Sequence, residues 1–162
     1  MATTAKELWA NIFRFFFATV QAEMIRDINV TDDVLAREAL SGLRKHAPKD
    51  SPTAKEVFAK CTPSETLEVV GTIAANIRKI ASSAVAAALD EDPGASEETI
   101  AKGTYVALGT QLPQYAEAIA IPFAIHLAQK YAAKCRRSDK TPKAWQAAFR
   151  RKVDAGRWAF RK

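Results

Sequence analysis

Three Ser/Thr-Pro pairs divide the chain: Ser51-Pro52, Thr62-Pro63 and Thr141-Pro142. A Ser or Thr hydroxyl at a helix N-cap accepts a hydrogen bond from a backbone N–H that has no partner within the helix. Proline suits the next position, because the N–H that it lacks would have been unpaired there. Each pair therefore predicts the start of a helix, and starts of this kind along the chain constrain it to an all-α fold.

Two further helix starts lie near the N-terminus. Thr4 and Glu7 have the spacing of a capping box, which predicts a first helix over residues 5–28. Thr31 precedes two aspartates, whose charges favour the first turn of a helix. A second helix is expected to begin there and to end near His46, before Pro48.

The second half of the chain predicts two more helices. Ser96 opens one of them, and Gly109 is the candidate for its end. Pro113 begins the most apolar helix, which is expected to reach about Arg137 and to bend at Pro122. The whole pattern predicts a single-domain bundle of about six to seven helices over residues 1–162.

Length and composition agree with one globular domain. Of the 162 residues, 48% are hydrophobic and 26% charged, which is typical of a chain that buries a core. No apolar stretch is long enough to span a bilayer, and the apolar run near Phe13 lacks the cleavage site of a secretory signal. A cytoplasmic protein is therefore expected.

Charge is distributed unevenly along the chain. Residues 130–162 contain twelve Lys and Arg residues against Asp139 and Asp154, a net charge of about +10. The other 129 residues contain twelve basic and sixteen acidic residues, a net charge of about −4. An acidic body with a basic end predicts a polyanion or an acidic surface as partner.

The helix expected after Thr141 is amphipathic. At 100° per residue, one face is apolar and consists of Trp145, Phe149, Val153, Gly156 and Phe160. A second face carries a basic stripe, consisting of Lys143, Arg150, Arg157 and Arg161. Trp158 lies beside that stripe, next to Arg151. With the apolar face packed on the rest of the protein, the cations would face solvent together with an aromatic ring.

This arrangement suits single-stranded RNA or another nucleic acid, because cations neutralise phosphates and an aromatic ring stacks on a base. The expected contacts are Trp158, as the stacking residue, and seven cations: Arg136, Arg137, Lys143, Arg150, Arg151, Arg157 and Arg161. A solvated basic face is the plainer interpretation. A basic helix that docks on an anionic membrane surface or on an acidic protein is the functional alternative.

Three apolar residues are candidate oligomerisation contacts. Ile121 and Ile125 lie off the main apolar side of their helix, which suggests a surface shared with another subunit. Phe15 lies off the main stripe of the first helix, so it is either part of the core or, if exposed, a subunit contact. A homo-oligomer is therefore expected.

Signals for an enzyme are absent from the sequence. There is no glycine-rich phosphate loop, HExxH, paired CxxC or GxSxG motif. Cys61 and Cys135 are far apart, and His46 and His126 have no ligand spacing with them, so neither a disulfide framework nor a zinc site is expected. We expect no catalytic residue, no metal and no cofactor.

Residues 123–160 resemble the core of coat proteins from flexible filamentous plant RNA viruses of the potexvirus and carlavirus type. The resemblance rests on three short motifs, which read Lys130-Tyr131-Ala132, Pro142-Lys143-Ala144-Trp145 and Arg157-Trp158-Ala159-Phe160. The family has Asp after the last Phe, where this chain has Arg161. The resemblance implies an all-helical subunit that binds single-stranded RNA in a basic groove, polymerises helically and is located in a virion.

Overall fold

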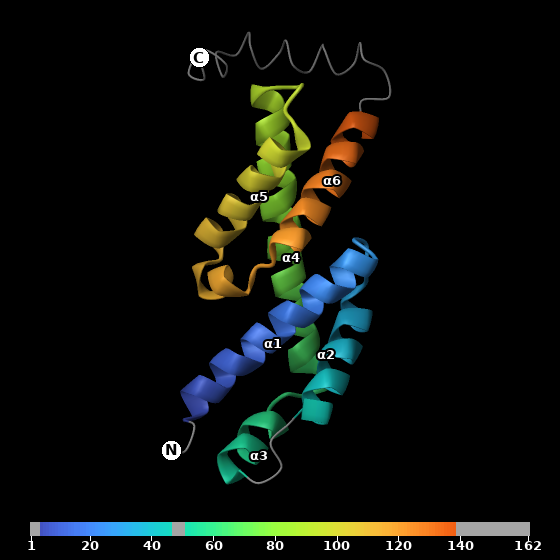
Figure 1. Cartoon of the computed structure of the whole chain (residues 1–162). Coiled ribbons are helices and arrows are strands. Elements are labelled where there is room, and N and C mark those ends of the chain that lie inside the picture. Colours follow the sequence, from blue (N-terminus) through green and yellow to red (C-terminus); the bar gives the residue numbers. More distant parts are fainter. Residues whose placement is uncertain (1–3, 47–50, 139–162) are drawn as a thin grey trace. The chain divides into compact units, whose positions relative to one another are not determined.

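A computed structural model describes residues 4–46 and 51–138 (Figure 1). These residues form six α-helices and one 3₁₀ helix and contain no strand, which confirms the all-α fold. The basic helix predicted after Thr141 lies outside the described residues. The elements are α1 (Ala5–Arg26), α2 (Asp32–His46), α3 (Pro52–Ala59), α4 (Pro63–Glu91), α5 (Glu97–Gln111), the 3₁₀ helix η1 (Pro113–Ala118) and α6 (Ile121–Ser138).

Apart from the start at Pro113, the predicted helix starts within the described residues are confirmed. Thr4 caps α1 in a full capping box: its Oγ1 accepts from the Glu7 N–H at 3.1 Å, and Glu7 Oε2 accepts from the Thr4 N–H at 3.3 Å. The hydroxyls of Ser51, Thr62 and Ser96 each accept from the N–H three residues later, at 3.2 Å. These bonds satisfy backbone donors that a helix leaves free at its N-terminus.

The prediction that α5 ends at Gly109 is wrong. The helix continues to Gln111, and the Leu112 N–H donates to the Leu108 oxygen at 2.8 Å. Both leucines are buried, and burying them stabilises the last turn by more than the roughly 1 kcal/mol that a helical glycine costs.

The single bent helix predicted from Pro113 to about Arg137 is also wrong. The chain forms η1, leaves helical geometry at residues 119–120, and restarts as α6 with Pro122 in the first turn. Proline cannot donate to the carbonyl four residues back, which is that of Ala118. That oxygen instead accepts from Gln21 Nε2 at 2.8 Å, so the chain separates into two elements where one was expected.

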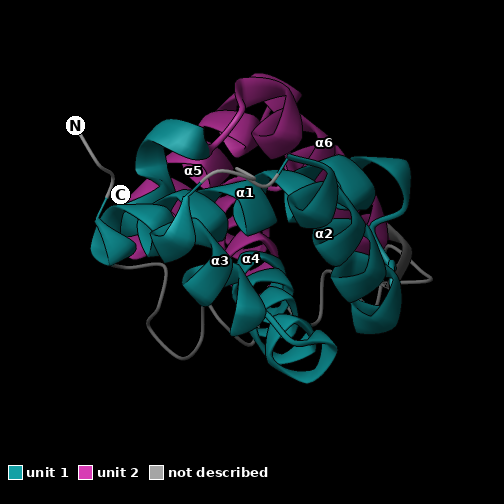
Figure 2. Ribbon diagram, turned by 90° about the horizontal axis from the view of Figure 1, so that it is seen from below, with its two compact units in different colours: residues 1–78, 114–118 teal, residues 79–113, 119–162 magenta. Residues whose placement is uncertain are grey.

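The described helices group into two compact units (Figure 2). Unit 1 contains residues 1–78 and 114–118, and unit 2 contains residues 79–113 and 119–162, so the long helix α4 contributes to both. None of the described helices is long and apolar enough to cross a membrane.

In unit 1, α1 packs on α2 and α3. Its buried face follows the helical repeat and includes Phe16, Phe17, Val20 and Met24, each at most 2% exposed. The aromatic ring of Phe17 stacks on Tyr115 of η1 with a centroid distance of 4.5 Å. Burial raises the pKa of the Tyr115 hydroxyl above its ordinary value.

An arginine fastens the loop between α1 and α2. Arg78 of α4 donates to the Val30 oxygen at 2.7 Å and to the Ile28 oxygen at 3.3 Å. Hydrogen bonds from a charged donor are stronger than neutral ones, so this side chain holds the loop against α4.

In unit 2, α5 packs along α6. The buried side chains from these helices include Ile100, Leu108, Phe123 and Leu127, each at most 1% exposed, and alanines fill the gaps between them. Val85 and Leu89 of α4 are also buried. The other face of the α5–α6 pair leaves several large apolar side chains exposed.

Candidate nucleic-acid interface

The C-terminal half of α6 is a basic surface. Lys130 and Lys134 are exposed and lie one turn apart, and Arg136 is exposed two residues later. Arg137 continues the spacing of four and three from the two lysines, in the last turn of the helix. Cations at a helix C-terminus are favoured by the helix dipole, so the fold supports this concentration of charge.

No acidic residue offsets this charge within the helix. The stretch from Ile121 to Ser138 contains neither Asp nor Glu. Among the described residues, no ion pair forms with Lys130, Lys134 or Arg136. The three cations are therefore available to a polyanion, and because they are exposed, their attraction for it will be screened by salt.

Of the eight predicted contacts, only Arg136 has a described side chain, and it is exposed. Arg137 is placed as part of α6, without its side chain. The other six lie outside the described residues: Lys143, Arg150, Arg151, Arg157, Trp158 and Arg161.

The structure adds Lys130 and Lys134 to the candidate contacts. They were counted in the basic segment but were not assigned as contacts. The four-residue spacing that places them on one helical face was visible in the sequence.

A second surface of unit 2 is an apolar groove between α5 and α6. Its lining includes Tyr105 and Val106 of α5 and Ile121 and Ile125 of α6, around a cavity of about 590 Å³. Among the described residues, these are four of the six large apolar side chains that are exposed. The groove is rimmed by charged and polar side chains from both helices: Glu97, Glu98, Lys102 and Gln129.

The two isoleucines predicted as oligomerisation contacts thus lie at the surface. Val106 and Ile121 are 62% and 61% exposed, and Ile125 is 40% exposed. Contiguous exposed apolar side chains usually mark a surface that another apolar surface covers. The exposure of Ile121 and Ile125 therefore agrees with a docking face.

Phe15, the third predicted oligomerisation contact, packs inside unit 1. Its ring is half-buried against α2, with a centroid distance of 6.3 Å to His46. A Cβ added to Gly42 would lie 2.6 Å from Phe15 Cζ, so the glycine makes room for the ring. This matches the core alternative for Phe15.

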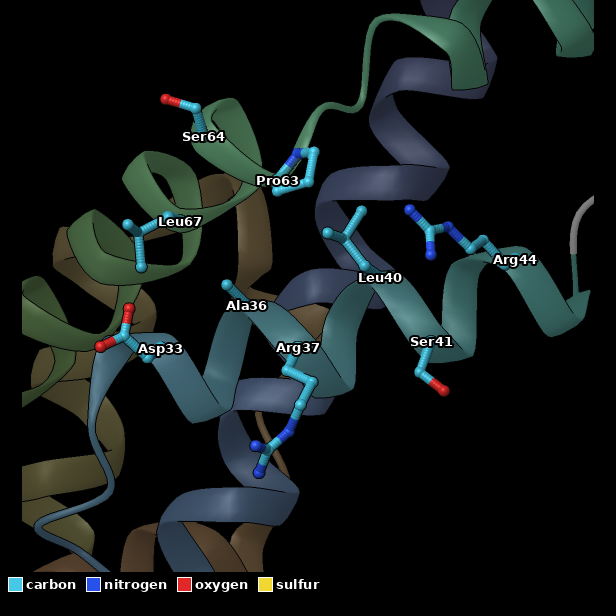
Figure 3. A pocket seen from close by; sticks show the side chains of 9 residues that line it. All are labelled: Asp33, Ala36, Arg37, Leu40, Ser41, Arg44, Pro63, Ser64 and Leu67. Atoms are coloured by element: carbon cyan, nitrogen blue, oxygen red, sulfur yellow. The ribbon is translucent and has the colours of Figure 1, made fainter.

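A hollow in unit 1 also presents basic side chains. Arg37, Ser41 and Arg44 project from successive turns of α2, and Pro63 and Ser64 lie opposite at the start of α4 (Figure 3). The Asp33 carboxylate lines the same hollow, and Arg37 Nε lies 4.0 Å from a Glu38 oxygen. Because its charges are mixed, the hollow is less basic than the carboxylate-free end of α6.

Among the described residues, Cys61 is one of the groups whose surroundings change its pKa. Burial, and then the nearby Glu65 carboxylate, raise the pKa of the Cys61 thiol, which disfavours the nucleophilic thiolate. In the described part of the chain, no group of three or more His, Cys, Asp or Glu side chains could hold a metal ion. His126 Nε2 is buried without a hydrogen-bond partner among the described residues.

Comparison with known proteins found no matching protein-family model, curated protein or solved structure.

Proposed function

We propose that this protein is a non-enzymatic, helical protein that binds single-stranded nucleic acid, RNA in particular, and packages it by self-association. The observation that carries the proposal is the C-terminal half of α6, where Lys130, Lys134 and Arg136 are exposed and no carboxylate lies between them. This helix leads directly into residues 139–162, which contain eight basic and two acidic residues. A flexible polyanion, such as a single-stranded nucleic acid, can follow a basic surface that continues over this many residues.

The expected mode of recognition is phosphate neutralisation without sequence readout. Lys130, Lys134 and Arg136 are exposed on a helix surface, where they can bind phosphates. Phosphate contacts carry no sequence information, which is read by hydrogen bonds to the edges of the bases. Trp158, beside the stripe of Arg150 and Arg157, would add stacking on an unpaired base. The preference for single strands thus depends on the aromatic ring, and the affinity on the cations.

Self-association is the second part of the proposal. It is supported by the exposed apolar side chains of unit 2 and by the resemblance of residues 123–160 to helically polymerising coat proteins. Size-exclusion chromatography with light scattering, with and without a single-stranded RNA, measures it. The expected result is a particle whose mass grows with RNA length, and one protein per RNA at every length would contradict packaging.

The binding test compares two matched charge reversals. In Arg150→Glu/Arg157→Glu the two arginines are seven residues apart in the basic segment. In Arg37→Glu/Arg44→Glu they are seven apart on α2. Gel retardation of a labelled single-stranded RNA at low salt should be abolished by the first pair and nearly unchanged by the second. Circular dichroism should show that both variants keep their helical content.

Anionic phospholipid vesicles and an acidic protein test the alternative partner. If the unaltered protein sediments with vesicles, or binds the acidic protein, and does not retard RNA or DNA, then nucleic-acid binding is excluded. The basic helix would then belong to a module that docks on an anionic surface.

A further inference from the structure

Gly109 lies inside a helix, at a position where the described residues do not require a glycine. α5 continues through it to Gln111, so the glycine does not end the helix. Apart from the helix's own backbone, no atom of the described residues lies within 4 Å of a Cβ built at this position. Glycine weakens a helix relative to alanine, and here no neighbour in the described fold offsets that loss. The position therefore leaves room for the close approach of another helix.

The open position lies on the same side of α5 as the apolar groove. Gly109 follows Tyr105 by four residues and Val106 by three, so the three positions are neighbours on the helix surface. Val106 and Ile121 protrude, 62% and 61% exposed, beside the cavity of about 590 Å³ that they line. One face of unit 2 thus combines protruding apolar side chains, a hollow and a position without a side chain.

We propose that this face is a contact between two copies of the chain, in which α5 packs antiparallel to the α5 of the second copy. The two-fold axis passes near the turn from Val106 to Gly109. In a two-fold contact the same patch serves on both sides, so the protruding side chains of each copy enter the hollow of the other. The inference rests on the proposed function, because it specifies the face through which copies associate, and it is tested without RNA.

The charges at the rim of the groove permit this contact. Lys102 Nζ lies 3.2 Å from Glu98 Oε1 in the same helix, so one carboxylate of the rim is already paired. Glu98 precedes Val106 by eight residues, which is about 12 Å along a helix that rises 1.5 Å per residue. Across the proposed axis, the charged ends of the two copies point in opposite directions. They lie more than about 20 Å apart, well beyond the Debye length of roughly 8 Å at physiological salt.

The contact also leaves the lysines of α6 available to phosphates. Lys130 follows Ile125 by five residues and Ile121 by nine. At 100° per residue, it lies roughly 140–180° around the helix from these two groove residues. Lys130 and Lys134 are both exposed. A dimer therefore presents two such basic surfaces, and a strand that reaches both is bound more tightly than one that reaches a single surface.

Sedimentation velocity of the full chain without nucleic acid tests the contact. The unaltered protein should show a monomer–dimer equilibrium, which Val106→Asp/Ile121→Asp should weaken by about a hundredfold or more, because two central apolar contacts are lost. The control Ile25→Asp/Leu67→Asp carries the same added charge in unit 1, at side chains that are 41% and 36% exposed. It should change dimerisation less than about twofold. A protein that stays monomeric at every concentration, or equal weakening in both variants, would overturn the proposal.

The glycines of α5 locate the axis with a matched pair of variants. A Cβ at Gly103 also meets nothing within 4 Å, but Gly103 lies roughly 120° around the helix from Gly109. In a background of Cys61→Ser and Cys135→Ser, Gly109→Cys should oxidise to a disulfide-linked dimer, because a residue near a two-fold axis meets its own copy. Gly103→Cys should stay monomeric. Equal yields of dimer from the two variants would contradict the proposed contact.

RNA retardation by the same samples separates this contact from the proposed nucleic-acid binding. A short oligonucleotide should be bound equally by Val106→Asp/Ile121→Asp and by the control, which has the same net charge. If the unaltered protein binds RNA but stays monomeric without it, the contact is excluded and nucleic-acid binding stands. If it dimerises through the groove and does not bind RNA, the contact stands and the proposed nucleic-acid binding is excluded.

Discussion

Among the described residues, unit 2 exposes four large apolar side chains and unit 1 exposes two, and a run of cations without carboxylates lies in unit 2. In unit 1 the Phe15 ring fills the space at Gly42, and Arg78 binds the carbonyls of the α1–α2 loop. In unit 2 the face opposite the core exposes Val106 and Ile121, and the end of α6 presents cations without carboxylates among its own residues. Both units consist of helices, and they differ in the apolar surface and the positive charge that they expose.

Under the proposed function, this difference predicts which surfaces bind a partner. Exposed apolar area does not stabilise a folded monomer, and neither does uncompensated charge. Surfaces with both features are therefore expected to bind a partner. The basic hollow of unit 1 shows the contrast, because Asp33 lies in it together with Arg37 and Arg44. We therefore propose that recognition belongs to unit 2 and structural support to unit 1.

The largest expected effect is on RNA affinity, and it compares charge reversal in unit 2 with charge reversal in unit 1. Lys130→Glu/Lys134→Glu, on α6, should weaken binding of single-stranded RNA by about tenfold or more at low salt and make binding less salt-dependent, because two phosphate contacts are lost. Arg37→Glu/Arg44→Glu should leave binding within about twofold. Fluorescence anisotropy with a labelled oligonucleotide measures both. An equal loss in the two variants would contradict the assignment to unit 2.

The next effect is on stability, and it concerns the hydrogen bonds that hold the α1–α2 loop of unit 1. Arg78→Met keeps most of the apolar stem and removes the bonds to Ile28 and Val30. It should lower the free energy of unfolding by about 2–3 kcal/mol, since hydrogen bonds from charged donors are among the stronger ones. Urea denaturation followed by circular dichroism measures the change, and Arg78→Lys should recover part of it. RNA affinity should not change, and a parallel loss of affinity would contradict the division of roles.

A pair of glycine substitutions should have effects of opposite sign. Gly42→Ala would place a Cβ 2.6 Å from Phe15 Cζ and should lower the melting temperature by displacing that ring. Gly103→Ala, in α5, meets nothing within 4 Å and should raise the free energy of unfolding by roughly 0.5–1 kcal/mol through helix propensity. Scanning calorimetry of the two variants provides the comparison. Stabilisation by Gly42→Ala would show that Phe15 is not held against α2.

The smallest expected effect uses two buried threonines. Thr66 Oγ1, in unit 1, is buried without a partner among the described residues, so Thr66→Val should stabilise the protein by up to about 1 kcal/mol. Thr104, in unit 2, donates to the Ile100 oxygen at 2.9 Å, so Thr104→Val should destabilise it by a similar amount. Chemical denaturation of both variants measures the signs. Destabilisation by Thr66→Val would indicate a partner for its hydroxyl.

Local signals in the sequence predicted helix starts well and helix ends poorly. Thr4, Ser51, Thr62 and Ser96 cap helices as expected, because an N-cap bond is made within three residues. The prediction that α5 ends at Gly109 was wrong, because burial of the neighbouring leucines outweighs the low helix propensity of glycine. Helix ends depend on packing between helices, which a local pattern does not contain.

The candidate site was predictable in its charge and not in its shape. The basic segment is a property of composition, and Lys130 and Lys134 follow from spacing alone. The apolar groove depends on which faces of α5 and α6 pair, so Val106 and Tyr105 did not stand out in the sequence. Phe15 illustrates the same limit, because whether it belongs to the core or to an interface depends on the position of Gly42.

The salt dependence of RNA binding tests the central claim most directly. Anisotropy titrations of a labelled single-stranded oligonucleotide with the full chain, repeated at several salt concentrations, give the slope of log affinity against log salt. Neutralisation of four to eight phosphates predicts a slope of about −3 to −6 for a single strand. Absence of binding at the lowest salt concentration, or an affinity that does not change with salt, would contradict the claim that unit 2 binds nucleic acid through its cations.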